Sequence, residues 1–256
     1  MNSLIKTPNE IALMRESGRL LASVFGELDD YIEAGVTTLE INDFVEGYIV
    51  DVLNARPASK GQYGYQFVLN SSINEVVCHG VPNSAKRLKN GDIINIDITL
   101  EKNGYIADSS KMYGIGTVPP LAKKLVDVTY EAMWKGINSV KHGSTLGDIG
   151  FAIEQHAKKH GYSVVREYCG HGIGQEMHED PQILHFGNAG SGLVLQEGMT
   201  FTIEPMINQG TYKTKLKKDG WTVVTRDKKL SAQWEHTVLV TASGVDVLTL
   251  RPEETR

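Results

Sequence analysis

Carboxylates occur in several stretches of the chain that are otherwise apolar. The stretch GDIINIDITLEKNGYIADSS holds Asp97 and Asp108, and isoleucines flank Asp97 at every second position, which is the period of a half-buried β-strand. Asn103–Gly104 is a strong signal for a two-residue hairpin turn. Pairing outward from this turn sets Asp97 opposite Ser110 and Thr99 opposite Asp108. The two carboxylates then become diagonal neighbours on one face, with their backbones about 7–8 Å apart across the two strands.

Two further carboxylates lie in similar surroundings, Glu204 in GMTFTIEPM and Glu235 in SAQWEHTVLV. Taken alone, Asp97 and Asp108 could belong to a solvated acidic strand face. Like charges at close range raise each other's pKa and repel unless a cation lies between them. If all four groups meet inside the fold, the cluster is costly without cations, so bound metal is the economical explanation.

An internal repeat suggests that these groups do meet. GVTTLEINDFVE (35–46) matches GSTLGDIGFAIE (143–154) at a displacement of 108 residues, and GDIINID (91–97) matches GMTFTIE (198–204) at 107. The shorter pair HGVP (79–82) and HEDP (178–181) is displaced by 99. Matches in the same order argue for two related halves, approximately 1–117 and 118–256. Glu204 is then the counterpart of Asp97, and His178 that of His79.

The segment EYCGHGIGQEMHEDP contributes His171 and His178. Its glycines could suggest a phosphate loop, but the dinucleotide-binding spacing is absent and no helix obviously follows. Beside four carboxylates, the two histidines favour metal binding or catalysis over a structural role. The cysteines, Cys78 and Cys169, lack the spacing of a zinc ligand set, and we interpret them as small buried hydrophobic residues.

The elements that must position these groups follow from the helical and strand periods. We expect helices over 8–33 and 120–141, and each repeated G-x-T segment opens another helix. Thr7, Pro8 and Glu10 form a start signal for the first helix, with a capping box and proline at its first turn. Each half would have two helices followed by antiparallel strands. No linker separates the halves, so we expect one catalytic domain over residues 1–256.

Composition narrows the class of protein. The chain has 256 residues, 41% of them hydrophobic and 22% charged, which is typical of a globular protein. A net charge of −5 leaves no basic footprint, so we expect no nucleic-acid partner. Two cysteines imply no disulfide framework. No signal peptide and no membrane span are evident in the sequence, and we expect a cytoplasmic protein.

The segments SINEVVCHGVP, GDIINIDIT, VVREYCGHGIG, GMTFTIEPM, KDGWTV and LSAQWEHT resemble the motifs of type I methionine aminopeptidases over nearly the whole chain. The resemblance implies the α+β pita-bread fold, with two pseudo-symmetric halves, an antiparallel sheet and outer helices. It also implies a centre of two divalent ions, with Asp108 and Glu235 as bridging ligands. The other implied ligands are Asp97, mainly for one ion, with His171 and Glu204 for the other. One imidazole among carboxylates suits cobalt, manganese, iron(II) or zinc, and the sequence does not choose among them.

The resemblance further implies removal of the N-terminal methionine from nascent polypeptides by attack of a metal-activated water on the first peptide bond. Glu204 would accept a proton from that water. His178 would donate a hydrogen bond to the carbonyl oxygen, and His79 would lie near the scissile nitrogen. The partners would be the N-termini of nascent chains at the ribosome, and the enzyme would be a monomer. Asn74, Ser231 and the carbonyl of Val76 match positions that hold a monovalent cation in the family.

The side-chain pocket departs from the family pattern GYPxSxCxSxNE. Tyr65 and Trp221 are retained, but Asn70 replaces the pocket cysteine and Met177 replaces an aromatic residue. Gln66 stands in place of proline and Ser59 in place of an upstream cysteine. A polar Asn70 weakens the fit of a methionine thioether unless its amide is satisfied elsewhere.

Two alternatives remain open. A related pita-bread peptidase could have another first-residue preference or Xaa-Pro specificity, although prolidase-like enzymes usually carry an extra N-terminal domain. A non-catalytic binding module on the same fold would have lost ligands, whereas all five are present here. Cleavage of peptides that differ in the first residue would separate the peptidases, and metal binding would separate them from the module.

Overall fold

The first helix begins where the sequence predicts. The structure, a computed structural model, describes residues 4–254, and α1 spans Pro8–Tyr31. The backbone N–H of Thr7 donates to Glu10 Oε2 at 2.7 Å, and the N–H of Glu10 donates back to Thr7 Oγ1 at 3.4 Å, which completes the capping box. The helix ends two residues before the expected Glu33, because Ile32 already has an extended conformation.

The repeated segments open equivalent helices. These are α2 (Thr38–Gly47) and α4 (Leu146–Lys159). The N–H of Thr37 donates to Glu40 Oε2 at 2.7 Å, and the N–H of Thr145 donates to Asp148 Oδ2 at 2.8 Å. Between them lies α3 (Pro120–Ile137), four residues shorter than expected because a turn begins at Asn138. The same cap at the same repeat position agrees with two related halves.

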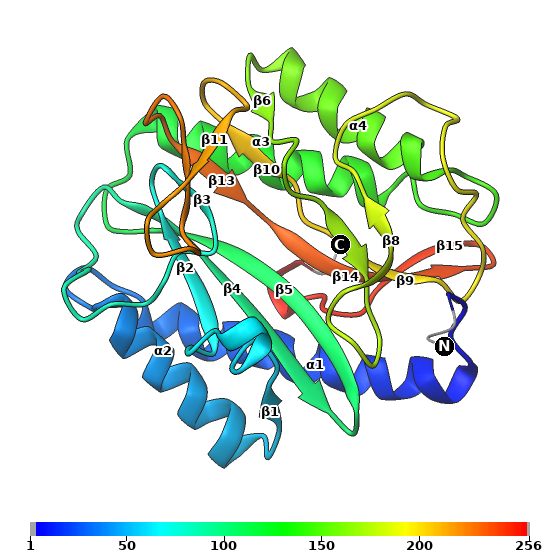
Figure 1. Cartoon of the computed structure of the whole chain (residues 1–256), viewed down its shortest axis with the longest axis horizontal. Coiled ribbons are helices and arrows are strands. Elements are labelled where there is room, and N and C mark those ends of the chain that lie inside the picture. Colours follow the sequence, from blue (N-terminus) through cyan, green and yellow to red (C-terminus); the bar gives the residue numbers. More distant parts are fainter. Residues whose placement is uncertain (1–3, 255–256) are drawn as a thin grey trace.

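The strands form one large antiparallel sheet and two small ones within residues 4–254 (Figure 1). The large sheet has the order β1 (Arg56–Pro57), β4 (Ile93–Lys102), β5 (Tyr105–Gly114), β14 (Glu235–Thr241), β9 (Thr200–Ile203), β7 (Gly170–Gly172) and β8 (Glu179–Ile183). In addition, β2 (Leu69–Ile73) pairs with β4, and β15 (Gly244–Val247) pairs with β14. The first small sheet has the order β13 (Ser231–Gln233), β10 (Met206–Asn208) and β6 (Ser163–Val164). The second has the order β11 (Thr214–Leu216), β12 (Val223–Thr225) and β3 (Val76–Cys78).

The β4–β5 hairpin has the register predicted from its turn. Asp97 pairs with Ser110 and Thr99 pairs with Asp108. Asn103 and Gly104 both have positive φ, 54° and 82°, as the favoured two-residue turns require. The expectation that β4 is half-buried is wrong for most of its polar face: Thr99 is 3% exposed, and Asn95 is 2% exposed and donates from Nδ2 to the carbonyl of Gln233 in β13 at 2.8 Å.

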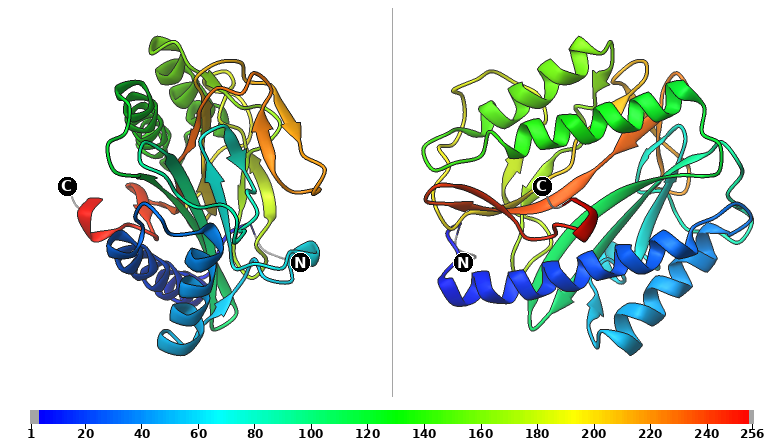
Figure 2. Two further views of the ribbon diagram at one scale, coloured as in Figure 1. Left: turned by 90° about the vertical axis from the view of Figure 1, so that its left-hand side faces the viewer. Right: turned by 180° about the vertical axis from the view of Figure 1, so that it is seen from behind.

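The two halves join at the centre of the large sheet. There β5 pairs with β14, with Ser110 opposite Glu235, and the order β2-β4-β5-β14-β9-β7 is symmetric about that contact. The four long helices lie on one side of the sheet, while the small sheets lie on the other (Figure 2). Apolar side chains of β4, including Ile96, pack under α1 and α2, and those of β9, including Phe201, pack under α3 and α4. The polar positions of β4 therefore face away from the helices. None of the helices in 4–254 is long and apolar enough to cross a membrane.

Candidate active site

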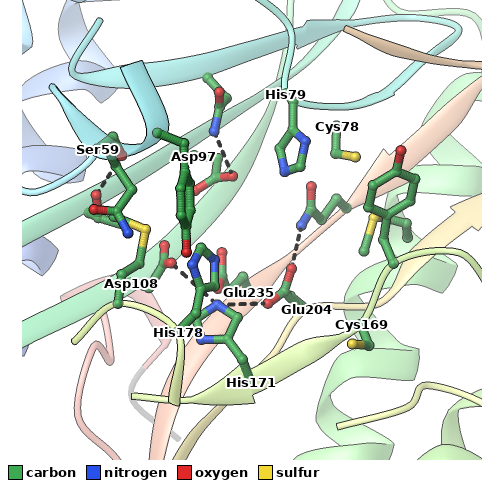
Figure 3. A pocket seen from close by; sticks show the side chains of 18 of the residues that line it. Ser59, Cys78, His79, Asp97, Asp108, Cys169, His171, His178, Glu204 and Glu235 are labelled. Carbon is green, nitrogen blue, oxygen red and sulfur yellow. Dashed lines mark hydrogen bonds and ion pairs between the residues drawn. The ribbon is translucent and has the colours of Figure 1, made fainter. Parts of the chain in front are cut away.

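A cavity of about 590 Å³ gathers carboxylate and imidazole side chains from strands of the large sheet and from the segments next to them (Figure 3). All five predicted metal ligands line it, as do both predicted catalytic histidines and the four predicted pocket residues. The lining residues among these are Asp97, Asp108, His171, Glu204, Glu235, His79, His178, Tyr65, Asn70, Met177 and Trp221. The structure therefore brings these predicted residues together in one place.

Neighbouring strands present the carboxylates side by side. Ser110 of β5 pairs with Asp97 of β4 on one side and with Glu235 of β14 on the other. These residues form one row across the sheet, and their side chains share a face. Asp108 lies two residues along β5 on the same face, and Glu204 follows the last residue of β9. Sheet register thus fixes the spacing of Asp97, Asp108 and Glu235.

The distances suit a cation among these groups. His171 Nε2 lies 3.8 Å from Asp108 Oδ2 and 3.5 Å from Glu204 Oε1. One ligand atom each from Asp108, His171 and Glu235 lies within 4.8 Å of the others. Asp108 Oδ1 and Glu235 Oε1 are buried without a hydrogen-bond partner among the described residues. Buried carboxylate oxygens are normally paired, so a divalent cation fits this donor set.

The carboxylates perturb one another electrostatically. Burial raises the pKa of Asp97 to about 6 and that of Glu204 to about 8. Burial, together with the charges of the neighbouring carboxylates, raises the pKa of Asp108 and of Glu235 well above its ordinary range. Cations in the cluster would reverse these shifts and hold the groups ionised. Without a cation, the charged cluster opposes folding.

Hydrogen bonds orient the histidine toward the carboxylates. His171 Nδ1 donates to the carbonyl of Gly172 at 3.0 Å, which leaves the lone pair of Nε2 facing the acidic groups. Burial lowers the pKa of His171 to about 3, so its imidazole is neutral, the form that binds metals. Thr202 Oγ1 accepts from the backbone N–H of His171 at 3.0 Å and donates to Glu204 Oε1 at 2.8 Å. Thr202 thus fixes two of the proposed ligands relative to each other.

The other two histidines flank the carboxylate cluster. The ring of His178 lies 4.4 Å from that of His171, and the ring of His79 lies 5.6 Å from that of Tyr168. Burial lowers the pKa of His79 to about 4 and also lowers that of His178. Both imidazoles are therefore neutral near pH 7 and can each donate one hydrogen bond into the cavity.

An aromatic and polar wall lies beside the acidic groups. The rings of Tyr65 and Trp221 are 4.9 Å apart, and the Tyr65 hydroxyl donates to the carbonyl of Leu69 at 2.9 Å. Asn70 Nδ2 donates to Asp97 Oδ2 at 3.4 Å. A pocket that accepts a thioether requires the Asn70 amide to be hydrogen-bonded elsewhere. This hydrogen bond to Asp97 meets that requirement.

Sequence reasoning missed several lining residues. Gln233 Nε2 donates to Glu204 Oε2 at 3.3 Å, and Tyr63 stacks on His178 with ring centroids 6.1 Å apart. Gln233 stands two residues before Glu235, which was the only available signal. The interpretation of both cysteines as buried is wrong for Cys169, which is partly exposed at the cavity wall, while Cys78 is buried.

The three residues predicted to hold a monovalent cation lie outside the cavity lining. Asn74 has a positive φ of 53° in the turn between β2 and β3. Its carbonyl accepts from the N–H of Ser231 at 2.9 Å. Ser231 Oγ is buried and has no hydrogen-bond partner within 4–254. Val76 begins β3 and is paired with Val224, so the three positions are held by adjacent strands.

Residues 12–242 match the sequence pattern of metallopeptidase family M24. The chain belongs to this family. It is 51% identical to the methionine aminopeptidase of Salmonella typhimurium over 251 residues, covering 98% of this chain and 95% of that protein. The resemblance to methionine aminopeptidases is therefore confirmed.

Solved M24 structures confirm the expected pita-bread fold. The crystal structure of methionine aminopeptidase from Rickettsia prowazekii matches with a TM-score of 0.94 and 51% identity, covering 96% of this chain and 99% of that one. The prolidase from Pyrococcus horikoshii matches with a TM-score of 0.77 and 24% identity, covering 98% of this chain and 65% of that one. The prolidase match shows a shared fold only.

Proposed function

We propose that the chain is a metal-dependent aminopeptidase that removes the N-terminal methionine from nascent polypeptides. The observation that carries this proposal is the set of four carboxylates, two of them buried, and one imidazole that line a single cavity. Membership of a metallopeptidase family and 51% identity to a methionine aminopeptidase support it. The ligands come from both halves of the large sheet, so the two halves would act as one catalytic domain.

The proposed ligands are Asp97, Asp108, His171, Glu204 and Glu235. Together they would hold two divalent ions, and Asp108 and Glu235 each offer a buried oxygen without a hydrogen-bond partner among the described residues. When bound, divalent ions lower the pKa of water and polarise the substrate carbonyl. The donor set accepts cobalt, manganese, iron(II) or zinc.

The remaining steps fall to the side chains around the proposed ligands. Glu204 would accept the proton of the attacking water. Thr202 and Gln233 hold the Glu204 carboxylate in position by hydrogen bonds. Neutral His178 would donate its N–H to the carbonyl oxygen as negative charge develops there, an interaction that strengthens in the transition state. His79, on the β3 side of the cavity, would hydrogen-bond near the scissile nitrogen.

The first side chain of the substrate would bind between the aromatic wall and Met177. Tyr65 and Trp221 supply apolar surface, and Met177 is buried. Asn70 keeps its amide toward Asp97, so its polar group does not have to be desolvated by a thioether. This arrangement supports methionine as the preferred first residue.

A panel of peptides Xaa-Gly-Met-Met, with and without added metal, tests the proposal. Methionine should be released faster than alanine or leucine, and a chelator should abolish release. Faster release of alanine or leucine would refute methionine as the preferred first residue but would not contradict metal-dependent peptide hydrolysis. Efficient cleavage of Xaa-Pro peptides would instead support the prolidase-like alternative. Absence of divalent-metal binding under reducing conditions would support the binding module.

Further parts of the proposal concern partners and ions. The substrate N-termini would be met at the ribosome, in the cytoplasm, by a monomeric enzyme that needs no nucleic acid.

A monovalent cation would bind near Asn74, Val76 and Ser231, where the buried Ser231 hydroxyl lacks a partner in 4–254. Addition of potassium or sodium should raise the melting temperature of the wild type more than that of Ser231→Ala.

A further inference from the structure

A second group of possible metal ligands lies away from the cavity. Helices α3 and α4 bring together Glu131, His156 and His160, and one ligand atom of each lies within 4.8 Å of the others. This helix pair covers the side of the sheet opposite the small sheets (Figure 2). None of the three residues lines the cavity, so the proposed active site does not account for them.

The geometry is that of a chelating pair on one helix face. His156 lies in the last turn of α4, and His160, four positions further on, is the residue that ends the helix, a spacing that brings two imidazoles to the same side. Their ring centroids are 4.8 Å apart at an angle of 48°. From α3, Glu131 Oε2 approaches His156 Nε2 to 2.9 Å. Two nitrogen donors and one oxygen donor therefore converge from two helices.

The surroundings favour a cation and partly fix one ligand. The group lies at the C-terminal end of α4, where the last carbonyls carry partial negative charge. The His156 side chain is only 13% exposed, whereas that of Glu131 is 55% exposed and can adjust. Lys158 is paired with Glu154 at 3.0 Å. Lys135 of α3 also acts on His156, with a smaller effect than Glu131, and Lys159 lies in the same last turn of α4.

We propose that Glu131, His156 and His160 form a peripheral site for zinc, nickel or copper that clamps α3 to α4. Two imidazoles select these late divalent ions over manganese and magnesium, which prefer oxygen ligands. The cavity, with one imidazole and four carboxylates, also suits manganese. The chain would therefore bind one more nickel or zinc ion than its active centre requires, and the additional ion would stabilise the second half.

Nickel titration of the full-length, tag-free chain tests the site. The informative variant is His160→Gln, which removes one nitrogen donor, and the matched control is His142→Gln. His142 is an exposed histidine outside the group. Wild type and His142→Gln should bind one more nickel ion than His160→Gln, or bind it at least tenfold more tightly. Equal stoichiometry and affinity in all three proteins would overturn the proposal.

A second measurement separates this site from the active centre. Zinc at a hundredfold excess over its Kd for the peripheral site should raise the melting temperature by about 5 °C more in wild type than in His160→Gln. Glu131→Gln should reduce the rise in the same direction, which covers the case in which His160→Gln folds poorly. Manganese-supported peptidase activity should be the same in the wild type and both variants. An identical zinc-induced rise in the wild type and both variants would refute the clamp.

Discussion

In the absence of metal, the surroundings of Glu204 favour its protonated form, whereas its proposed role requires the ionised form. It is buried among other carboxylates, and burial raises its pKa to about 8, from an ordinary value of 4.5. As a proposed ligand and proton acceptor it must be ionised. Cations would resolve the conflict, since they favour the charged form of every carboxylate in the cluster. In the metal-free protein, ionisation of these carboxylates therefore lowers the free energy of unfolding.

This conflict predicts how the stability of the metal-free protein depends on pH. A carboxyl group with a raised pKa keeps in the folded state a proton that the unfolded chain has lost, so the free energy of unfolding falls as pH rises toward the folded pKa. Above pH 7 the histidines, whose pKa values are lowered, are neutral in the folded state and mostly neutral in the unfolded chain, so they offset only a small part of this fall. Between pH 7 and 8 we expect a fall of up to about 1.4 kcal/mol per proton retained.

Guanidinium unfolding with a chelator, at several pH values between 7 and 8, measures this fall. The profile of Glu204→Gln should be flatter than that of wild type, because one titrating group is removed. Saturating manganese or cobalt should remove the dependence. A free energy of unfolding that stays constant or rises over this interval in the metal-free wild type would contradict the prediction.

His178 gives a prediction about catalysis alone. It is not a proposed ligand, and its neutral ring faces the cavity beside His171. His178→Ala should lower kcat about 10²–10³-fold, the usual effect of losing one donor to a developing oxyanion, with little change in KM. Metal content by elemental analysis should equal that of wild type, and the surface variant His142→Ala should retain full activity. Loss of bound metal from His178→Ala would show that the residue acts on the metal centre instead.

At the scale of elements, the site depends on close packing between β7 and its neighbours. Gly172 follows His171 in β7, and it is paired with Glu179 of β8 and with Phe201 of β9. A Cβ at Gly172 would lie 2.1 Å from the carbonyl oxygen of Asp180. Only a residue without a side chain allows the strands to approach this closely. The position of His171 therefore depends on its glycine neighbour.

Gly172→Ala should consequently lower the free energy of unfolding by about 1–3 kcal/mol through overpacking, and it should weaken metal binding by displacing His171. The matched substitution is Gly26→Ala in α1, where a Cβ meets nothing within 4 Å. That change should stabilise the protein by about 0.5–1 kcal/mol, because alanine is the better helix former. Chemical denaturation and metal titration compare the two variants. Equal stabilities would show that β7 can move away from β8 without cost.

At the scale of the whole molecule, a buried arginine connects the C-terminal segment to both halves. Arg251 is 1% exposed, and its Nη2 donates to Glu254 Oε1 at 2.8 Å. Its Nη1 donates to Ser109 Oγ of β5 at 3.2 Å, and its guanidinium lies 5.3 Å from the ring of Phe25 in α1. Glu254 Oε2 also pairs with His236 of β14 at 3.1 Å. One network therefore holds β5, β14 and α1 together behind the cavity.

Arg251→Ala should destabilise the protein by about 3–5 kcal/mol, because it leaves the Glu254 carboxylate buried without its cation. The double variant Arg251→Ala/Glu254→Ala should lose less than the sum of the two single variants, since each partner is costly chiefly when alone. Denaturant unfolding of the four proteins of this cycle measures the coupling. Additive losses would show that the pair does not act as a unit.

Local interactions account for what could be predicted from the sequence. The turn at Asn103–Gly104 and the two-residue period fixed the β4–β5 register, and the capping residues fixed where α1 begins. The repeat and the family motifs predicted that ligand-type side chains from distant segments would meet. Each of these signals is contained in a short segment or in its copy, so the amino-acid order alone carries it.

Tertiary structure decided which partner each polar side chain has. It turned the Asn70 amide toward Asp97, buried Asn95 of β4 against β13, left Cys169 at the cavity wall, and added Gln233 beside Glu204. It also brought Glu131 of α3 close to His156 and His160 at the C-terminal end of α4. The sequence by itself determined the chemistry that the chain can perform. Only the folded structure determined these partners, because hydrogen bonds and burial depend on segments that the sequence order keeps apart.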